Sequence, residues 1–175
     1  MLTQGEANAG IHARRLKSGD ALAGVEFPLY PFDGQQFYRT DLVGTFYYDG
    51  SRSKWLSVRA VEVDFSIASA LGAAGYWNLP GAGVSSATFG HVAAFDMTCT
   101  GVSFCFEATP GSFNIVLRQN GTVTGAGIVT GGAQSGSDTA VNVDFDEGDI
   151  IGCRSSNATP TGSGHVRAVF RRRAS

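Results

Sequence analysis

The sequence is short of charged residues and of long apolar runs, and each shortage excludes a class of protein. Only 16% of its 175 residues are charged and the net charge is −2, which gives no support to binding of nucleic acid. No run approaches the roughly 20 apolar residues of a membrane-spanning helix. The polar stretch Met1 to Gly10 lacks the apolar centre of a signal peptide. We therefore expect a soluble protein whose partners are neither nucleic acid nor membrane.

Cysteine is also scarce, since the chain has only Cys99, Cys105 and Cys153. An odd number does not suit a disulfide framework. Cys99 and Cys105 fall in one expected strand, about 20 Å apart along it, which is beyond the reach of a disulfide. We expect folding in a reducing cytoplasm, with all three cysteines acting as small buried apolar side chains.

Catalytic motifs are missing as well. The three histidines, His12, His91 and His165, are far apart in the sequence, and no metalloprotease, nucleophile-elbow, phosphate-loop or paired-cysteine motif occurs. A cysteine paired in space with His91 or His165 remains an open alternative, because such pairs form between distant segments. The sequence favours a protein that is not an enzyme and holds no cofactor.

What the sequence does contain is glycine and alternation. Its 24 glycines are scattered without a period, which favours many turns. Between them, apolar residues recur at every second position, the period of a half-buried strand rather than a helix. The alternating runs include Val61 to Ile67, Phe104 to Phe106, Phe113 to Leu117, Val141 to Phe145 and Val166 to Phe170.

These runs amount to about eight short strands from Arg59 onward, the number that a jelly roll requires. The strongest hairpin signal is Asn120-Gly121, because both residues tolerate the positive φ of a type I′ turn. We expect an all-β fold: an antiparallel jelly-roll sandwich over residues 59–175.

Two further segments precede that domain. Residues 1–24 read as an extended N-terminal arm, in which Ile11, Arg14, Arg15, Leu16 and Lys17 suit a short basic helix. An arm so poor in apolar residues is expected to rest on a neighbouring subunit or another protein.

Residues 25–58 read as a small β-meander with a hairpin at Asp49-Gly50 and a very high density of aromatic residues. Two explanations apply to these aromatics. We favour a small core of their own over an aromatic platform for a ligand.

Three other features have both a structural and a functional interpretation. The acidic stretch 144–149 suits a solvated turn better than a Ca²⁺ site, since it lacks the EF-hand spacing. The tail Arg171 to Arg173 suits a solvated strand end, with binding to an acidic neighbour or to nucleic acid as alternatives. Tyr76 and Trp77, in the loop from Ser69 to Ser86, suit packing between subunits or stacking on a sugar ring.

Two stretches resemble known families. The end of the chain looks like the end of the jelly roll of tumour-necrosis-factor-like ligands and complement globular heads. The residues that carry this resemblance are Phe145, then Glu147-Gly148-Asp149-Ile150-Ile151, then the strand His165 to Phe170. The aromatic stretch Phe37 to Leu42, with Phe46 to Gly50 and Trp55 to Ser57, resembles a module that precedes such jelly rolls in small structural proteins of tailed bacteriophages.

The resemblance implies assembly into homotrimers, with apolar residues of one sheet meeting at the axis. In phage particles such proteins act as capsid cement (decoration) proteins, head fibres or tail-fibre tips. The chain lacks the signal peptide, collagen repeat and membrane stalk of secreted relatives, which favours a virion component assembled in the bacterial cytoplasm.

We therefore expect a capsid cement protein on the virion surface. Its arm, through Ile11, Arg14, Arg15, Leu16 and Lys17, would bind the major capsid protein or another virion protein. The alternative is a head- or tail-fibre tip that binds a host-surface receptor or glycan, with Tyr76 and Trp77 as outer-loop contacts.

Overall fold

A computed structural model describes residues 22–67, 75–156 and 162–174, and every regular element within these ranges is a β-strand. The expected all-β class is therefore confirmed. In chain order the strands are β1 Leu22–Gly24, β2 Gln36–Arg39, β3 Gly44–Asp49, β4 Lys54–Ile67, β5 Asn78–Leu79, β6 Gly83–Val84, β7 His91–Val92, β8 Met97–Phe106, β9 Asn114–Gln119, β10 Thr122–Val129, β11 Ser135–Asp138, β12 Val143–Phe145, β13 Ile150–Ser156 and β14 Gly164–Arg173.

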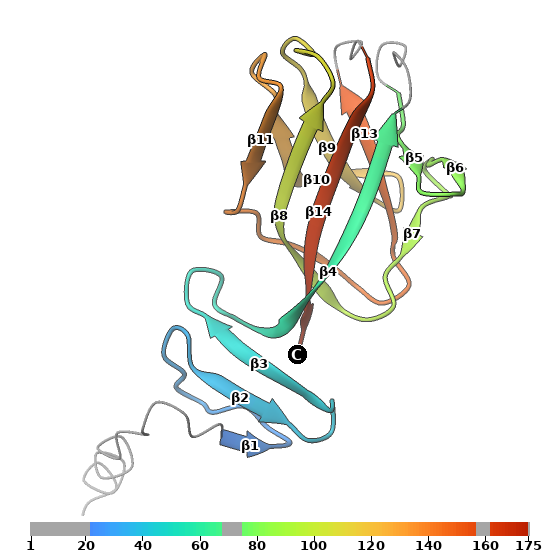
Figure 1. Cartoon of the computed structure of the whole chain (residues 1–175). Coiled ribbons are helices and arrows are strands. Elements are labelled where there is room, and N and C mark those ends of the chain that lie inside the picture. Colours follow the sequence, from blue (N-terminus) through green and yellow to red (C-terminus); the bar gives the residue numbers. More distant parts are fainter. Residues whose placement is uncertain (1–21, 68–74, 157–161, 175) are drawn as a thin grey trace, which may run out of the picture.

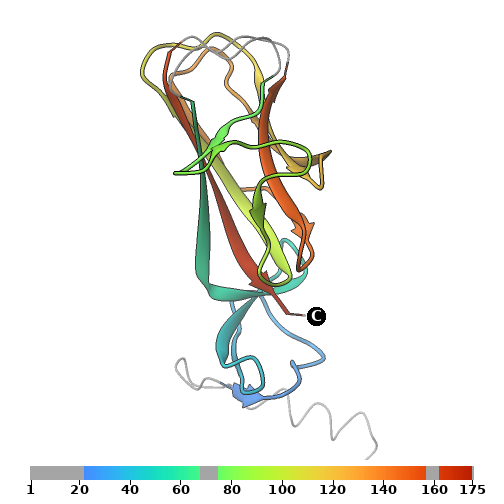
Figure 2. The same cartoon turned by 90° about the vertical axis from the view of Figure 1, so that its right-hand side faces the viewer.

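The strands form two sheets, which stack as the two layers of a sandwich in the upper part of the molecule (Figures 1 and 2). The larger sheet has the order β1-β2-β3-β4-β14-β8-β11, with β12 also pairing with β8 and the short β5 and β6 attached beside β4. The smaller sheet has the order β10-β9-β13-β7. All pairs are antiparallel except β1 with β2.

The main core fills the space between the layers, because alternate residues of facing strands point inward. On β4 these are Val63, Phe65 and Ile67, and on β14 they are Val166 and Phe170, all of them buried. Phe145 packs edge-on against Phe170 with ring centroids 5.4 Å apart. The expected alternation over these strands is confirmed.

The turns follow the sequence signals closely. Gln119 pairs with Thr122 across the hairpin, and Asn120 and Gly121 have φ values of 50° and 80°, as a type I′ turn requires. In the acidic stretch Gly148 has a φ of 89°, so it provides the tight bend expected of it.

The lower part of the molecule is the meander, formed by β1, β2, β3 and the beginning of β4 (Figure 1). The hairpin expected at Asp49-Gly50 is present, since Asp49 pairs with Lys54. The expected domain boundary between residues 58 and 59 falls inside β4, which runs without interruption from the meander into the sandwich. Residues 58–62 of β4 are all exposed. We call this stretch the neck.

Candidate interaction surfaces

The meander has the aromatic core that its sequence predicts. Phe37, Phe46 and Trp55 are buried together, and Phe27 stacks on Trp55 with ring centroids 4.5 Å apart and an interplanar angle of 8°. The Arg39 guanidinium lies over the Phe27 ring, 4.6 Å from its centroid. These aromatics therefore pack on one another, as the favoured explanation required.

A second group of apolar residues in the meander faces solvent. The segment Val25 to Phe32, between β1 and β2, exposes Val25, Leu29, Tyr30 and Phe32 by 60 to 89% of their surface. We call this segment the apolar loop. Several large apolar side chains exposed within one short segment are typical of a contact site. Pro28 and Pro31 restrict its backbone, which lowers the entropy lost when such a loop binds.

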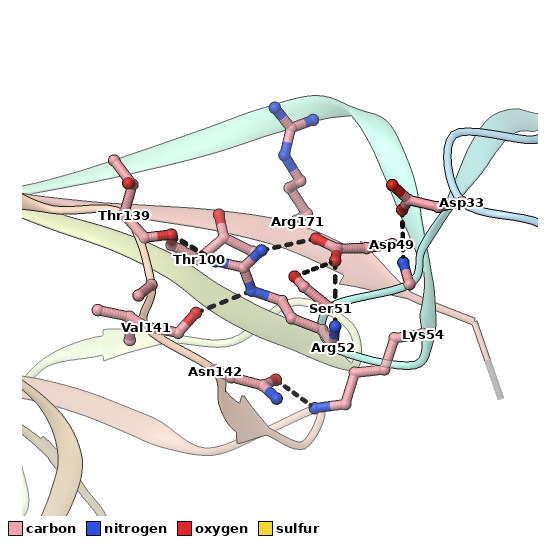
Figure 3. Close-up of polar contacts among 12 residues, drawn as sticks. Asp33, Asp49, Ser51, Arg52, Lys54, Thr100, Thr139, Val141, Asn142 and Arg171 are labelled. Atoms are coloured by element: carbon pink, nitrogen blue, oxygen red, sulfur yellow. Dashed lines mark hydrogen bonds and ion pairs between the residues drawn. The ribbon is translucent and has the colours of Figure 1, made fainter.

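The turn between β3 and β4 is fixed to the sandwich by Arg52 (Figure 3). Its guanidinium donates to the carbonyl oxygens of Thr100, Thr139 and Val141 at 3.2, 2.5 and 2.9 Å, and to the Asp49 carboxylate at 2.6 Å. The two side chains are only 13% and 10% exposed. We call this arrangement the Arg52 clamp.

Protonation of Asp49 is disfavoured within the clamp. Burial opposes ionisation of this carboxyl group, but hydrogen bonds from Ser51 and Arg52 outweigh it and hold the pKa of Asp49 below its usual value. The same balance applies to Asp144. Burial raises the pKa of Asp144, but hydrogen bonds from Lys54 and Thr98 and the charge of Arg173 lower it by more. The pKa of Asp144 therefore lies below its usual value.

The side chains of the arginine tail bind other groups of the chain. Arg171 donates to the carbonyl oxygens of Ser57 and Val58 at 2.8 and 2.6 Å. Arg173 pairs with Asp144 at 3.2 Å and with Asp146 at 2.7 Å. The expectation of a solvated strand end is wrong here, because these side chains bind backbone and acidic groups of their own chain.

The acidic stretch is occupied in the same way. Asp144 and Asp146 pair with cations, as above, and Asp149 accepts hydrogen bonds from the side-chain amides of Gln119 and Asn120 and from the Asp146 backbone N–H. Over residues 22–67, 75–156 and 162–174 no group of three His, Cys, Asp or Glu side chains suits a metal ion. These carboxylates therefore stabilise the turn and the ion pairs with Lys54 and Arg173.

A groove of about 530 Å³ lies beside the neck, between the meander and the sandwich. Its walls include Leu42 and Val43 from the turn between β2 and β3, Val58 and Val61 from the neck, and Arg172. Arg172 reaches across toward the Leu42 carbonyl oxygen at 3.4 Å and lies 5.5 Å from the Phe95 ring centroid.

Tyr76 and Trp77 do not form the expected pair of outer-loop contacts. Trp77 is wholly buried and packs edge-on against Phe106 in the main core, so it can neither stack on a sugar nor contact another subunit. Tyr76 is half-buried, with the guanidinium carbons of Arg118 and Arg154 at 5.7 and 5.6 Å from its ring centroid. The loop from Ser69 to Ser86 has no alternation of apolar and polar residues, so its sequence does not indicate that Trp77 points into the core.

The arm residues proposed from the sequence, Ile11, Arg14, Arg15, Leu16 and Lys17, lie outside the described residues. Among the residues that the structure describes, no helix is long and apolar enough to cross a membrane.

The outer face of the larger sheet is charged. Arg167 on β14 pairs with Glu62 at 3.0 Å and with Asp64 at 2.9 Å, both on β4. His165 lies beside them, with Nε2 3.3 Å from the Asp64 carboxylate. The neighbouring β8 adds Cys105, which is exposed, whereas Cys99 and Cys153 are buried. The expectation of three buried cysteines is therefore wrong for Cys105, whose position on β8 points outward.

The sequence reasoning missed the Arg52 clamp and the exposed Cys105. Arg52 follows a turn signal and belongs to no motif, so nothing near it in the sequence indicates that it is buried. Its burial comes from strands that are distant in sequence. No protein-family model matches the chain, and no curated protein matches it at a significant level.

Proposed function

We propose that the chain is a jelly-roll protein of a phage particle, which assembles as a homotrimer and binds the capsid as a cement protein. The strand pairing supports the jelly roll. If β4, β7, β8, β9, β10, the β11–β12 stretch, β13 and β14 are numbered 1 to 8, the pairs are 1-8, 2-7, 3-6 and 4-5. A long hairpin folded over on itself gives these pairs and the sheet orders 1-8-3-6 and 2-7-4-5, an arrangement of the jelly-roll kind.

The observation that carries the attachment role is the apolar loop. Leu29 is 89% and Tyr30 77% exposed, although Phe27 of the same loop packs against the aromatic core of the meander. The loop directly follows β1 (Leu22–Gly24), so it lies close in the chain to the arm proposed from the sequence. We assign the meander end of the molecule to the particle and the sandwich to the outside.

The exposed valines of the smaller sheet support contact between copies. Val123 and Val129 on β10, at one edge of this sheet, are 55% and 61% exposed, and Val92 on β7, at the opposite edge, is 65% exposed. The outer face of the larger sheet bears ion pairs instead. Three copies would therefore meet through the smaller sheet, and three linked attachments would strengthen binding without tighter individual contacts.

Stabilisation of the particle would follow from mass action, because a protein that binds only the assembled shell favours it by the free energy of binding. The fibre-tip alternative loses one of its two proposed contacts, since Trp77 is buried. Copy number separates the two roles: a cement protein is present in far more copies per particle than a fibre tip.

The test uses particles of the phage that encodes the chain and quantifies the protein by gel and mass spectrometry. We expect a copy number comparable to that of the capsid subunits, and sedimentation of the purified chain as a trimer. Particles lacking the chain, mixed with the Leu29→Asp, Tyr30→Asp double variant, should stay undecorated. The matched control is Val84→Asp, at another exposed apolar position. A handful of copies per particle, or full decoration by the double variant, would overturn the proposal.

A further inference from the structure

The larger sheet brings together a cysteine and a histidine that are 60 positions apart in the sequence. Cys105 on β8 and His165 on β14 are direct partners across the two strands. Directly opposite residues point to the same face, with Cβ atoms about 4.5–5.5 Å apart. Cys105 is exposed and the His165 side chain is 45% exposed, so both are open to a small solute.

The histidine is oriented by a carboxylate on its other side. His165 Nε2 lies 3.3 Å from Asp64 Oδ1, and the same oxygen accepts a hydrogen bond from Arg167 Nε at 2.9 Å. A carboxylate at Nε2 favours the imidazole tautomer with its proton on that nitrogen, which leaves Nδ1 as the proton acceptor. Thiol, imidazole and carboxylate thus lie on three adjacent strands in the order of a nucleophile, a base and a group that orients the base.

The other two cysteines, Cys99 and Cys153, differ from Cys105 in their surroundings. Burial raises the pKa of the Cys99 thiol to about 12 and raises that of Cys153 as well. Both therefore stay protonated, and both are buried away from solutes. A thiol must be reached by a disulfide before it can attack one, and among the cysteines of the described chain this holds for Cys105, since Cys99 and Cys153 are buried.

We infer that Cys105 is a reactive thiol on the outer face of the larger sheet, which exchanges with small-molecule disulfides. His165 acts as its base and Asp64 as a positioning residue. In the exchange the Cys105 proton passes to His165 and the thiolate attacks one sulfur of a disulfide RSSR. A bond forms between Cys105 Sγ and that sulfur while the S–S bond of RSSR breaks. The leaving thiolate RS⁻ takes the proton from the imidazolium, so the products are capped Cys105 and RSH.

The groups around the thiol are compatible with this role. On its own strand the neighbour on the same face is Ser103, the exposed Glu107 lies just beyond the end of β8, and β11 contributes Ser135. The thiol itself lies 4.0 Å from the backbone carbonyl oxygen of Phe106. On the other side stand the charges of β14 and β4, namely Arg167, Asp64 and Glu62, which pair with one another. The inference does not depend on the proposed function, since it concerns the purified chain alone.

The experiment measures capping of Cys105 by oxidised glutathione in the purified full-length chain, followed by peptide mapping with mass spectrometry. We expect the mixed disulfide on Cys105, none on Cys99 or Cys153, and none anywhere in the folded Cys105→Ser variant. His165→Gln should slow the reaction at pH 7 at least tenfold, and Asp64→Asn should slow it less. The matched control is Ser135→Ala, which alters the other cross-strand partner of Cys105 and should leave the rate unchanged.

The pH profile separates a base from a residue that only shapes the surface. A free thiol ionises without help above about pH 9.5, so the rate of His165→Gln should approach that of the wild type there while remaining slow at pH 7. Equal rates for the two proteins at pH 7, or a ratio that does not change with pH, would overturn the inference. Modification of buried Cys99 or Cys153 in preference to Cys105 would do so too.

Discussion

The sandwich and the meander reach a folded state by different means. In the sandwich, a continuous core that includes Phe65, Trp77 and Phe170 lies between two sheets and is closed to solvent. In the meander, one layer of strands covers Phe37, Phe46 and Trp55, and partly buried side chains such as Phe27 complete the cluster. A unit with so small a core buries little apolar surface and gains little stability from it.

Contacts with the sandwich therefore stabilise the meander. The Arg52 clamp, the Lys54–Asp144 ion pair and the Arg171 hydrogen bonds tie it to the sandwich, and β4 passes through both parts. The difference suggests that a small unit can keep apolar side chains such as Leu29 and Tyr30 exposed when its own stability comes from a larger neighbour.

The largest expected effect comes from the core of the sandwich. Phe65 is wholly buried between the sheets, so Phe65→Ala should lower the free energy of unfolding by about 3–5 kcal/mol. The meander should not stay folded once the sandwich unfolds, because it depends on the sandwich. The two tryptophans provide the measurement: Trp55 reports on the meander and Trp77 on the core. In urea the midpoint reported by Trp77 should be lowered, and Trp55 should report unfolding at that midpoint or below it. A Trp55 signal that stays native after the Trp77 signal is lost would contradict the dependence.

Much of the sandwich was predictable, because alternation and turn chemistry are local. The strand around Phe65 and the hairpin at Asn120-Gly121 follow from neighbouring residues alone. The contact between Cys105 and His165 depends on the register of β8 against β14, and the Arg52 clamp on three carbonyl groups that lie about 50 to 90 residues downstream. Periodicity does not encode such long-range register, and Trp77 was misplaced for the same reason.

Trp55→Ala tests the comparison from the side of the meander. Trp55 is 8% exposed and stacks on Phe27, so we expect a loss of about 3 kcal/mol that falls mainly on the meander. Hydrogen exchange should accelerate in β1, β2 and β3 while β8 and β14 keep their protection. Equal acceleration in both parts would show that they unfold as one cooperative unit.

Arg52→Ala should have the next largest effect. It leaves the buried Asp49 carboxylate without its cation and removes donors from three carbonyl groups, which we expect to cost about 2–3 kcal/mol. The loss should appear as faster exchange in β3 and the first residues of β4. The matched control is Arg59→Ala in the exposed neck, expected to change stability by less than about 0.5 kcal/mol. Similar losses for both variants would show that the clamp contributes nothing specific.

Acid should lower the stability of the meander, with the smallest effect among these predictions. The cause is a set of carboxylates whose pKa values are low in the folded chain. Hydrogen bonding by Arg39 holds the pKa of Asp41 at about 2, and those of Asp49 and Asp144 are also lowered. An unfolded Asp has a pKa of about 3.9, so the unfolded chain binds more protons between these values. The stabilisation is therefore complete above about pH 5 and is lost as the pH falls toward 2.

Trp77→Phe leaves Trp55 as the sole fluorescent tryptophan of the chain and so makes the meander visible alone. In this background we expect the urea midpoint to fall between pH 5 and pH 3, and Asp144→Asn to lower it at pH 5 but to weaken its dependence on pH. Glu107→Gln, at an exposed site remote from the junction, is the matched control and should keep the full dependence. A midpoint that rises on acidification would contradict the sign of the effect, since it would require carboxylates that bind protons more tightly in the folded chain than in the unfolded one.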